Sequence, residues 1–263
     1  MTKIKSLKKI GRALLVAAFW IGVWAIAAYR FGKPLLFPSP VSVLKTLIEL
    51  LGTKEFYLAT GNSLANILLG TVSAILCACI LVVITSRIHF VRDLIHPIMA
   101  VVKATPVASF IILMLLFLGP IKVPAFITFL IVLPIVWTNL DQGIKSIDPQ
   151  LQEVAKMYRF SLLKRLRVLI FPSVKPYFLS ACKTSIGLAW KAGVAAEIIA
   201  MPPKTIGTMI GEAKLYIMSA EMFAWTLTVV LLSLAIEFGV SYLFSKFDAS
   251  NIKKEVIQHA ENN

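Results

Sequence analysis

Five charged side chains lie within long apolar stretches of the sequence, where an ionised group needs a partner or a function. They are Lys103, Lys183, Lys191, Glu197 and Glu237. A charge at the centre of a lipid-length helix costs at least about 2.5 kcal/mol, so such residues reach a surface, pair, or face a polar pathway. Lys183 and Glu237 lie near enough to the ends of their stretches to reach a surface or pair. Glu197 suits an outer gate, an ion pair or a solute contact.

Lys103 and Lys191 lie deepest, and their neighbours suit the wall of a cavity. Lys103 shortly precedes Pro106, which lacks a backbone N–H and can break a helix. Lys191 is followed by the small residues 192–196, which suit close helix packing. The two lysines favour a cationic cavity and an anionic solute, unless Lys191 pairs with Glu197. The candidate pathway residues are Lys103, Thr105, Pro106, Trp190, Lys191 and Glu197.

The sequence contains no pattern for bond-breaking chemistry or for metal binding. The phosphate-binding pattern G-x-x-x-x-G-K-[ST] does not occur, and no Ser-His-Asp set is recognisable. Cys77, Cys79 and Cys182 lie in apolar stretches without a His at metal-ligand spacing, which is typical of packing residues. We therefore expect no enzymatic activity, no metal site and no cofactor bound by this chain. Any pumping must be powered by a partner.

The composition indicates a membrane protein. Of 263 residues 58% are hydrophobic and 15% charged, and the mean hydropathy is +0.83, all outside the usual range of soluble domains. A lipid core about 30 Å thick requires about 20 apolar helical residues. We predict an all-α integral membrane protein with six transmembrane helices, at residues 13–29, 64–85, 94–118, 124–140, 174–200 and 222–244. A cleaved signal peptide is the alternative for the first of them.

The net charge of +14 could indicate a nucleic-acid partner, but the distribution of Lys and Arg indicates a membrane orientation instead. With the N-terminus inside, the predicted inner segments with the adjoining Lys175 carry 17 of the 27 Lys and Arg, the outer segments 7 and the spans 3. This asymmetry is the positive-inside pattern. We expect both termini inside and no nucleic-acid partner. The chain divides into a basic cytoplasmic N-terminus (1–12), a transmembrane domain (13–245) and a cytoplasmic tail (246–263).

Two of the predicted outer segments contain helical patterns of their own. Residues 35–52 begin with a proline-rich turn and continue with leucines and valines at helical spacing, which predicts a short amphipathic helix at the outer surface. Residues 201–222 begin with a Pro-Pro break, followed by a helical segment interrupted by glycine.

The stretch 148–172, DPQLQEVAKMYRFSLLKRLRVLIFP, is a basic insert between two apolar stretches, on the predicted cytoplasmic side. Asp148 suits the N-cap of a helix and Pro149 its first turn. The apolar face of this helix consists of Leu151, Val154, Ala155 and Tyr158. Ser161 can cap a second amphipathic helix, which we predict to end at Pro172.

Three interpretations of this helix pair fit its pattern. It can lie in the headgroup layer, with its lysines and arginines against anionic lipid. It can insert its apolar face into a groove on a soluble partner. It can also be the gate or sensor of a channel. Periodicity alone does not separate the three.

The segment EVAKMYRFSLLKRLRVLIFP resembles the cytoplasmic EAA loop in the permease subunits of bacterial ABC importers. The family pattern is Glu-Ala-Ala, three residues, Gly, nine residues, then Ile-x-Leu-Pro. Glu153, Val154 and Ala155 match its first element in two of three positions, and Pro172 lies at the required distance. Arg159 occupies the glycine position. Because a left-handed conformation costs an L-residue about 1 kcal/mol or more, we predict a different turn geometry at Arg159.

Three further stretches, LLFPSPVSVL, KATPVASFIILMLLFLG and GLAWKAGVAAEII, resemble the nitrate/sulfonate/taurine-type branch of these permeases, and the resemblance covers roughly residues 13–245. It implies that the insert 148–172 forms coupling helices that dock on an ATP-binding subunit. It also implies two permease copies, expected to be a homodimer, two ATP-binding subunits that use ATP and Mg, and an extracytoplasmic solute-binding protein. The docking residues would be Leu151, Glu153, Val154, Ala155, Tyr158, Arg159 and Pro172.

We therefore expect a multi-pass permease subunit of the cytoplasmic (inner) membrane, surrounded by lipid, that works by alternating access. The solute would be a small organic or inorganic anion, such as a sulfonate, nitrate or taurine, or a vitamin precursor. A secondary transporter or channel that works without an ATPase is the alternative.

Overall fold

The computed structural model describes the backbone of residues 2–261 and the side chains of residues 11–12, 14–161, 163–244 and 246. Every regular element in that part of the chain is helical, which confirms the all-α prediction. The elements are α1 (Thr2–Phe31), α2 (Pro40–Leu51), α3 (Lys54–Arg87), α4 (His89–Ala104), α5 (Val107–Lys145), α6 (Pro149–Met157), α7 (Leu162–Arg165), the π-helix η1 (Leu166–Ile170), α8 (Phe171–Ala200), α9 (Ile206–Leu215) and α10 (Ser219–Glu261).

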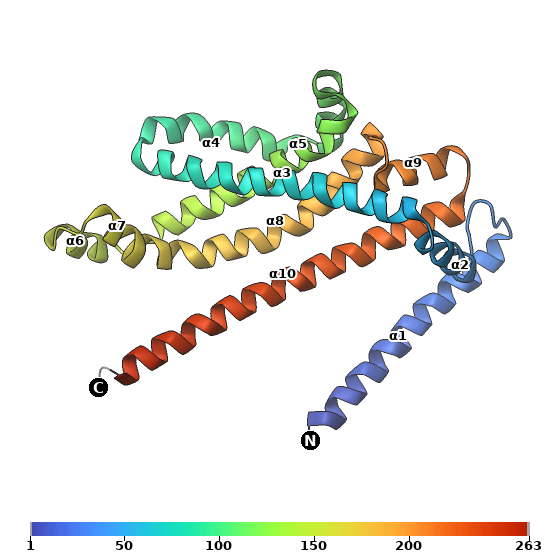
Figure 1. Ribbon diagram of the computed structural model, residues 1–263, viewed down its shortest axis with the longest axis horizontal. Helices are drawn as coiled ribbons and strands as arrows, with labels where there is room; N and C mark the ends of the chain where they lie inside the picture. The colour runs from blue at the N-terminus through green and yellow to red at the C-terminus, as the bar shows by residue number, and fades with distance from the viewer. Residues whose placement is uncertain (1, 262–263) are drawn as a thin grey trace.

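The long helices α3, α5 and α8 pack together between two distinct ends of the molecule (Figure 1). One end is formed by α6, α7 and η1, and the other carries α2 and α9. α10 contacts α2, α8 and α9 and then leads away from the α9 end. α1 diverges from the other helices, and only 6% of its apolar stretch 14–31 is buried. The core of the chain therefore lies between α3, α5 and α8.

Glycine residues allow these three helices to pack closely. A Cβ at Gly70 of α3 would lie 2.2 Å from the carbonyl oxygen of Ala125 in α5. A Cβ at Gly193 of α8 would lie 2.4 Å from Cγ1 of Ile67, and both positions also touch Thr128. Close approach through small residues is how helices associate tightly in a lipid environment. A larger side chain at Gly70 would meet the backbone of α5, and one at Gly193 would have to displace the side chain of Ile67.

Four helices in the described part of the chain are long and apolar enough to cross a membrane. They include the stretches Leu14–Phe31, Lys54–Arg87, Val107–Lys145 and Ser219–Phe244. Their outward side chains are apolar; Phe238, for example, is 81% exposed. α4 is too short to be one of them, and the charged residues of α8 lower its mean hydropathy. The total of six transmembrane helices therefore stays a prediction.

The predicted third and fourth spans have different boundaries in the structure. The stretch 94–118 is not one helix, because α4 ends at Ala104 and the next residues, Thr105 and Pro106, are extended. Pro106 was recognised as a residue that can break this helix, although 94–118 was predicted as a single transmembrane helix. The second half of 94–118 and the whole of 124–140 belong to α5, which kinks at Gly119, where φ is 69°. Glycine adopts this backbone without steric cost, so α5 can reverse direction there.

The short surface helices were predicted correctly. α2 begins at the N-cap Ser39, whose Oγ accepts the N–H of Ser42, and it buries Val43 and Leu47. α9 follows the break at Pro202 and Pro203. At the other end of the chain, α10 continues as one helix through the stretch predicted as a separate tail, as far as Glu261.

Candidate functional site

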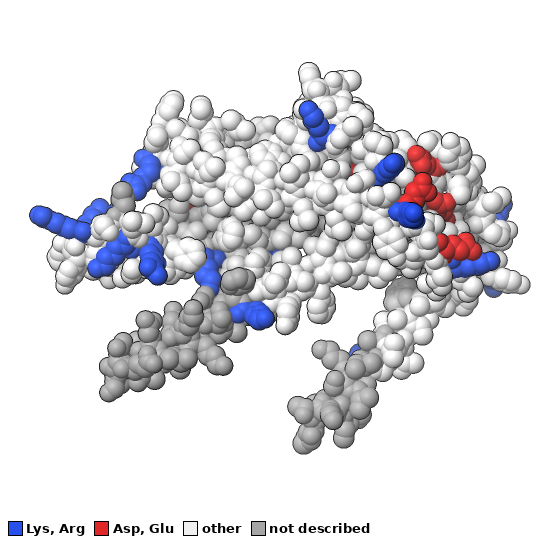
Figure 2. Space-filling model, in the orientation of Figure 1, with Lys and Arg blue, Asp and Glu red and all other residues white. Residues whose placement is uncertain are grey.

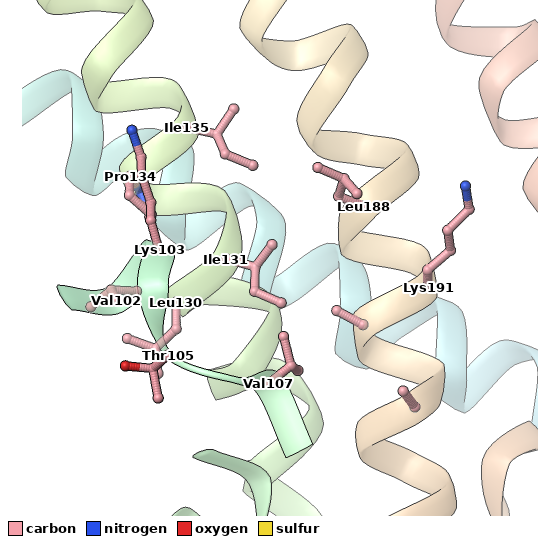
Figure 3. A pocket seen from close by; sticks show the side chains of 12 residues that line it. Val102, Lys103, Thr105, Val107, Leu130, Ile131, Pro134, Ile135, Leu188 and Lys191 are labelled. Atoms are coloured by element: carbon pink, nitrogen blue, oxygen red, sulfur yellow. The ribbon is translucent and has the colours of Figure 1, made fainter. Parts of the chain in front are cut away.

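A cavity of about 440 Å³ lies between α4, α5 and α8 (Figure 3). Its lining residues are Val102, Lys103, Thr105, Val107, Leu130, Ile131, Pro134, Ile135, Leu188, Lys191, Ala192 and Ala195. The walls are mostly apolar, and the charged groups are the two lysines. Three of the six predicted pathway residues, Lys103, Thr105 and Lys191, thus come together from helices far apart in the sequence. The break between α4 and α5 places Thr105 at this cavity.

The two lysines lie on opposite sides of the cavity and have different surroundings. Lys103 Nζ donates a hydrogen bond of 2.7 Å to Thr138 Oγ1, which in turn donates to the carbonyl of Pro134. Lys191 points away from the other lining side chains (Figure 3) and has no hydrogen bond or ion pair within the described residues. Both side chains are exposed. An anion near this cavity would meet positive charge at both margins of an apolar surface.

Glu197 lies outside the cavity and is fully buried. Its Oε2 accepts hydrogen bonds from Ser63 Oγ at 2.6 Å and from the N–H of Gly207 at 3.2 Å. Ser63 also accepts the N–H of Ile206 at 2.9 Å. The carboxylate therefore joins α3 and α8 to the first turn of α9, where a helix N-terminus favours negative charge. No ion pair joins it to Lys191 among the described residues.

Trp190 and Pro106 also lie outside the lining set. Trp190 is buried, and its Nε1 donates a 3.0 Å hydrogen bond to the carbonyl of Val229, which fastens α8 to α10. Pro106 is the N-cap of α5, and its carbonyl accepts the N–H of Ser109. The contribution of α5 to the cavity wall was not predicted from the sequence. Pro134, a second proline inside an apolar stretch, was the signal that could have revealed it.

The predicted helix at 149–158 is α6. The Oδ1 of Asp148 accepts the N–H of Gln150 at 2.8 Å, and Pro149 occupies the first turn, as the sequence indicated. Of the predicted apolar face, Leu151, Val154 and Tyr158 are 52%, 46% and 72% exposed. The fourth member, Ala155, is instead buried against Ile147 and Leu169, within the helix pair. Met157 was not predicted and is 81% exposed beside them.

The prediction of a different turn geometry at Arg159 is wrong. Arg159 has φ 48°, which is the left-handed conformation that a glycine would adopt there. The N–H of Phe160 bonds to the carbonyl of Ala155 at 2.9 Å, and the N–H of Arg159 bonds to that of Lys156 at 3.0 Å. This is the Schellman motif, completed by the packing of Phe160 near Ala155. Two backbone hydrogen bonds and this packing hold Arg159 in place despite its Cβ.

Pro172 was predicted to end the second helix, but the structure shows that it does not. The chain stays helical from Leu162 through α8, and Pro172 lies in the first turn of α8. Just before it the hydrogen bonding widens to the π pattern, with the N–H of Phe171 bonded to the carbonyl of Leu166. A proline ring crowds the carbonyl four residues earlier, that of Val168, and a π turn moves this carbonyl aside.

Basic residues gather at the α6–α7 end of the molecule. Figure 2 shows Lys and Arg concentrated there, whereas the acidic residues visible on this face lie at the opposite end, near α2 and α9. Glu153 and Arg159 are both exposed among them on α6 and the following turn. The α6–α7 end therefore combines exposed apolar side chains with positive charge.

Comparisons with known proteins agree with these features. The family model described as "Binding-protein-dependent transport system inner membrane component" matches residues 66–249. The chain is 24% identical to the taurine transport system permease protein TauC of Escherichia coli, over 89% of this chain and 86% of the relative. It is 25% identical to the putative aliphatic sulfonates transport permease protein SsuC of Bacillus subtilis, over 81% and 78%. It is 26% identical to the nitrate import permease protein NrtB of Synechocystis sp., over 73% and 72%.

Proposed function

The chain belongs to the family of binding-protein-dependent transport system inner membrane components, and we propose that it forms the solute pathway of an ATP-driven importer. As a transport component it is not an enzyme, and ATP hydrolysis belongs to a separate subunit. The observation that carries the ATP-driven mechanism is the exposed apolar face of α6, at the basic end of the molecule.

We assign six membrane crossings. They are α1, α3, α4 together with α5 as far as Gly119, the rest of α5, α8 and α10. The basic α6–α7 end faces the cytoplasm by the positive-inside rule, and the α2–α9 end faces outward (Figure 2). α1 and α10 both lead from the α2–α9 end toward the termini, which supports termini on the cytoplasmic side (Figure 1). Residues 1–12 and 246–263 would then flank the membrane domain on that side.

In this assignment α6 and α7 dock on the ATP-binding subunit. Leu151, Val154 and Tyr158 insert into a groove of that subunit, as an amphipathic helix does when its apolar face finds a partner. Glu153 and Arg159 contact the rim of the groove. Ala155 and Pro172 act inside the helix pair: the first packs its core and the second shapes its continuation into α8. ATP-driven closure of the partner moves the pair and switches the cavity between outward and inward openings.

The cavity needs a second wall, since α4, α5 and α8 bound it in this chain. We propose a second copy of the chain as that wall, two ATP-binding subunits that use ATP and Mg below it, and an extracytoplasmic solute-binding protein at the α2–α9 end. Lipid covers the remaining apolar exterior. No nucleic-acid partner is required, because the membrane orientation accounts for the positive charge.

The proposed solute is a small anion, of the sulfonate, nitrate or taurine kind, with a vitamin precursor as the other class. Lys103 and Lys191 support an anion, because neither ammonium is neutralised by an acidic residue within the described part of the chain. The names of the relatives, which refer to taurine, aliphatic sulfonates and nitrate, point to the same class.

The ATP-driven mechanism is tested by co-purification with the ATP-binding subunit. Leu151→Asp should weaken the association at least about tenfold, because it places a charge in the groove. Leu215→Asp is the matched control, since Leu215 is a similarly exposed leucine (68% against 52%) at the opposite end, on α9. Solute uptake at the full rate by vesicles that hold this chain alone would instead support a secondary transporter or channel, and the proposal would be wrong.

The substrate class is tested by uptake of nitrate and taurine against a neutral solute of similar size. Lys191→Ala and Lys103→Ala should each reduce the preference for the anion. Lys183→Ala is the control, because Lys183 lies two turns from Lys191 on α8 but does not line the cavity. An unchanged preference in both cavity variants would exclude these lysines from anion selection.

A further inference from the structure

α4 is a short helix bounded by two breaks in the helical backbone. It follows Ile88, which is extended (φ −118°, ψ 98°), and precedes the extended residues Thr105 and Pro106. Of its sixteen residues, all of which are described, only Met99 is buried. Residues at element ends are the positions that absorb changes in dihedral angles when a helix moves. α4 is therefore lightly packed and has a hinge position at each end.

Side chains fasten α4 to α5 at three points along its length. Near its start, Arg92 Nη2 lies 2.9 Å from Oδ2 of Asp141. One turn later, the ring of His96 meets the ring of the buried Trp137 edge to face, with centroids 6.3 Å apart. At the far end, Lys103 donates to a threonine of α5. Only the first of these three points joins opposite charges.

Asp141 lies where an acidic residue is not favoured for stability. It is one turn before Lys145, the last residue of α5, and a helix C-terminus disfavours negative charge. Its side chain is 12% exposed, and two cations lie 2.9 Å from Oδ2: Arg92, which is 23% exposed, and Lys145, which is 55% exposed. Apolar residues often replace a buried ion pair without loss of stability. The pair therefore points to a role beyond holding the fold.

The same end of α5 leads directly into α6. Ile147 follows two residues after α5 and is buried with Ala155 of α6 and Leu169 of η1. Asp148 then caps α6. A displacement of α6 therefore acts on the end of α5 within two turns of Asp141.

We propose that Asp141 is a positioning residue for transport, which couples the α5–α6 junction through Arg92 to α4 and so to the cavity wall. The inference rests on the proposed function, because it takes α6 as the element moved by the ATP-binding subunit. α4 presents Val102 and Lys103 to the cavity, so a shift of α4 changes the cavity directly. Among the described residues, Arg92–Asp141 is the ion pair that joins α4 to another helix.

The test measures whether nucleotide moves the cavity wall. Val102→Cys is introduced into the complete complex, with the three native cysteines replaced by alanine. Its reaction with a water-soluble maleimide is followed without nucleotide and with MgATP plus vanadate. With Asp141 present, the two rates should differ by roughly 5- to 150-fold, the range of typical coupling between sites. Asp141→Asn should abolish this difference while the complex still hydrolyses ATP.

Controls separate coupling from simple stabilisation. Lys145→Gln removes the exposed partner and leaves the link between helices, so the rate difference should persist. The exchanged pair Arg92→Asp with Asp141→Arg should restore part of the difference. If Asp141→Asn does not assemble, Arg92→Gln provides the same measurement from the more exposed partner. A purely structural ion pair would lower the yield of the complex and leave the rate difference intact.

The possible outcomes distinguish the two proposals. If Asp141→Asn and Arg92→Gln both retain the nucleotide-dependent difference, the role of Asp141 is overturned and the proposed function stands. If the unsubstituted chain binds no ATP-binding subunit, the proposed function itself is wrong.

Discussion

Replacing Arg159 by glycine should stabilise the turn between α6 and α7 without changing its geometry. Arg159 already has φ 48° and already makes the two hydrogen bonds of a Schellman motif. The left-handed conformation costs an L-residue about 1–2 kcal/mol, and glycine avoids this cost because it has no Cβ. Glycine also gives the unfolded chain more freedom, which offsets about 0.5–1 kcal/mol. The net gain is about 0.5–1 kcal/mol, or a factor of roughly 2–5 in the local opening constant.

Hydrogen exchange measures this opening directly, because the amides of residues 159 and 160 donate the two hydrogen bonds. After correction for intrinsic rates, Arg159→Gly should slow their exchange by roughly 2- to 5-fold. Arg159→Ala is the matched control, since alanine removes the guanidinium but keeps the Cβ, and its exchange should not slow.

Two outcomes would refute this reasoning. If glycine and alanine slow exchange equally, the gain comes from removing the guanidinium and not from the backbone angle. If the glycine variant exchanges faster than the unsubstituted protein, the Arg159 side chain itself stabilises the turn.

Three further substitutions test the packing and capping of the surface helices. Gly207→Ala would place a Cβ 2.2 Å from Cβ of Glu197 and should cost about 1–3 kcal/mol of stability. This cost should appear as a lower Tm in detergent. Gly61→Ala is the control, because Gly61 has open space around it and the substitution should not lower the Tm. Ser63→Ala should leave the N–H of Ile206 without a partner and remove one of the two hydrogen bonds to Glu197 Oε2, cost about 1–3 kcal/mol and speed exchange of the first amides of α9; unchanged exchange would contradict the bonding described. Asp148→Ala should cost about 1 kcal/mol and speed exchange in the first turn of α6, whereas Asp148→Asn, which retains an accepting oxygen, should not.

Local patterns predicted the elements of the fold well, because they depend on neighbouring residues. Asp148 and Pro149 gave the start of α6, and Pro106 gave the break between α4 and α5. The errors arose where packing overrides local preference. Arg159 adopts a backbone angle that its own propensity disfavours, because contacts between α6 and η1 outweigh the cost. Pro172 stays inside a helix because a π turn makes room for its ring.

The candidate site was predictable only in part. The free-energy cost of a charge in an apolar helix was enough to identify Lys103 and Lys191 as candidate pathway residues, and both line the cavity. The same argument also marked Glu197, which is instead buried at the start of α9. Whether a charged residue faces a cavity or a buried polar cluster depends on residues distant in the sequence, such as Ser63 for Glu197. No periodicity within one helix contains that information.

At Gly70 α3 meets the backbone of α5, and Gly193 of α8 packs against the side chains of Ile67 and Thr128, so a shift of these helices relative to one another would require both contacts to be repacked. We therefore expect α3, α5 beyond Gly119 and α8 to move together as one block. The backbone is non-helical at Ile88, Thr105 and Gly119, and these are the positions where it can bend. In the proposed transport cycle we expect this block to move as a whole while the backbone bends at these positions, so that its interior stays packed while a solute passes.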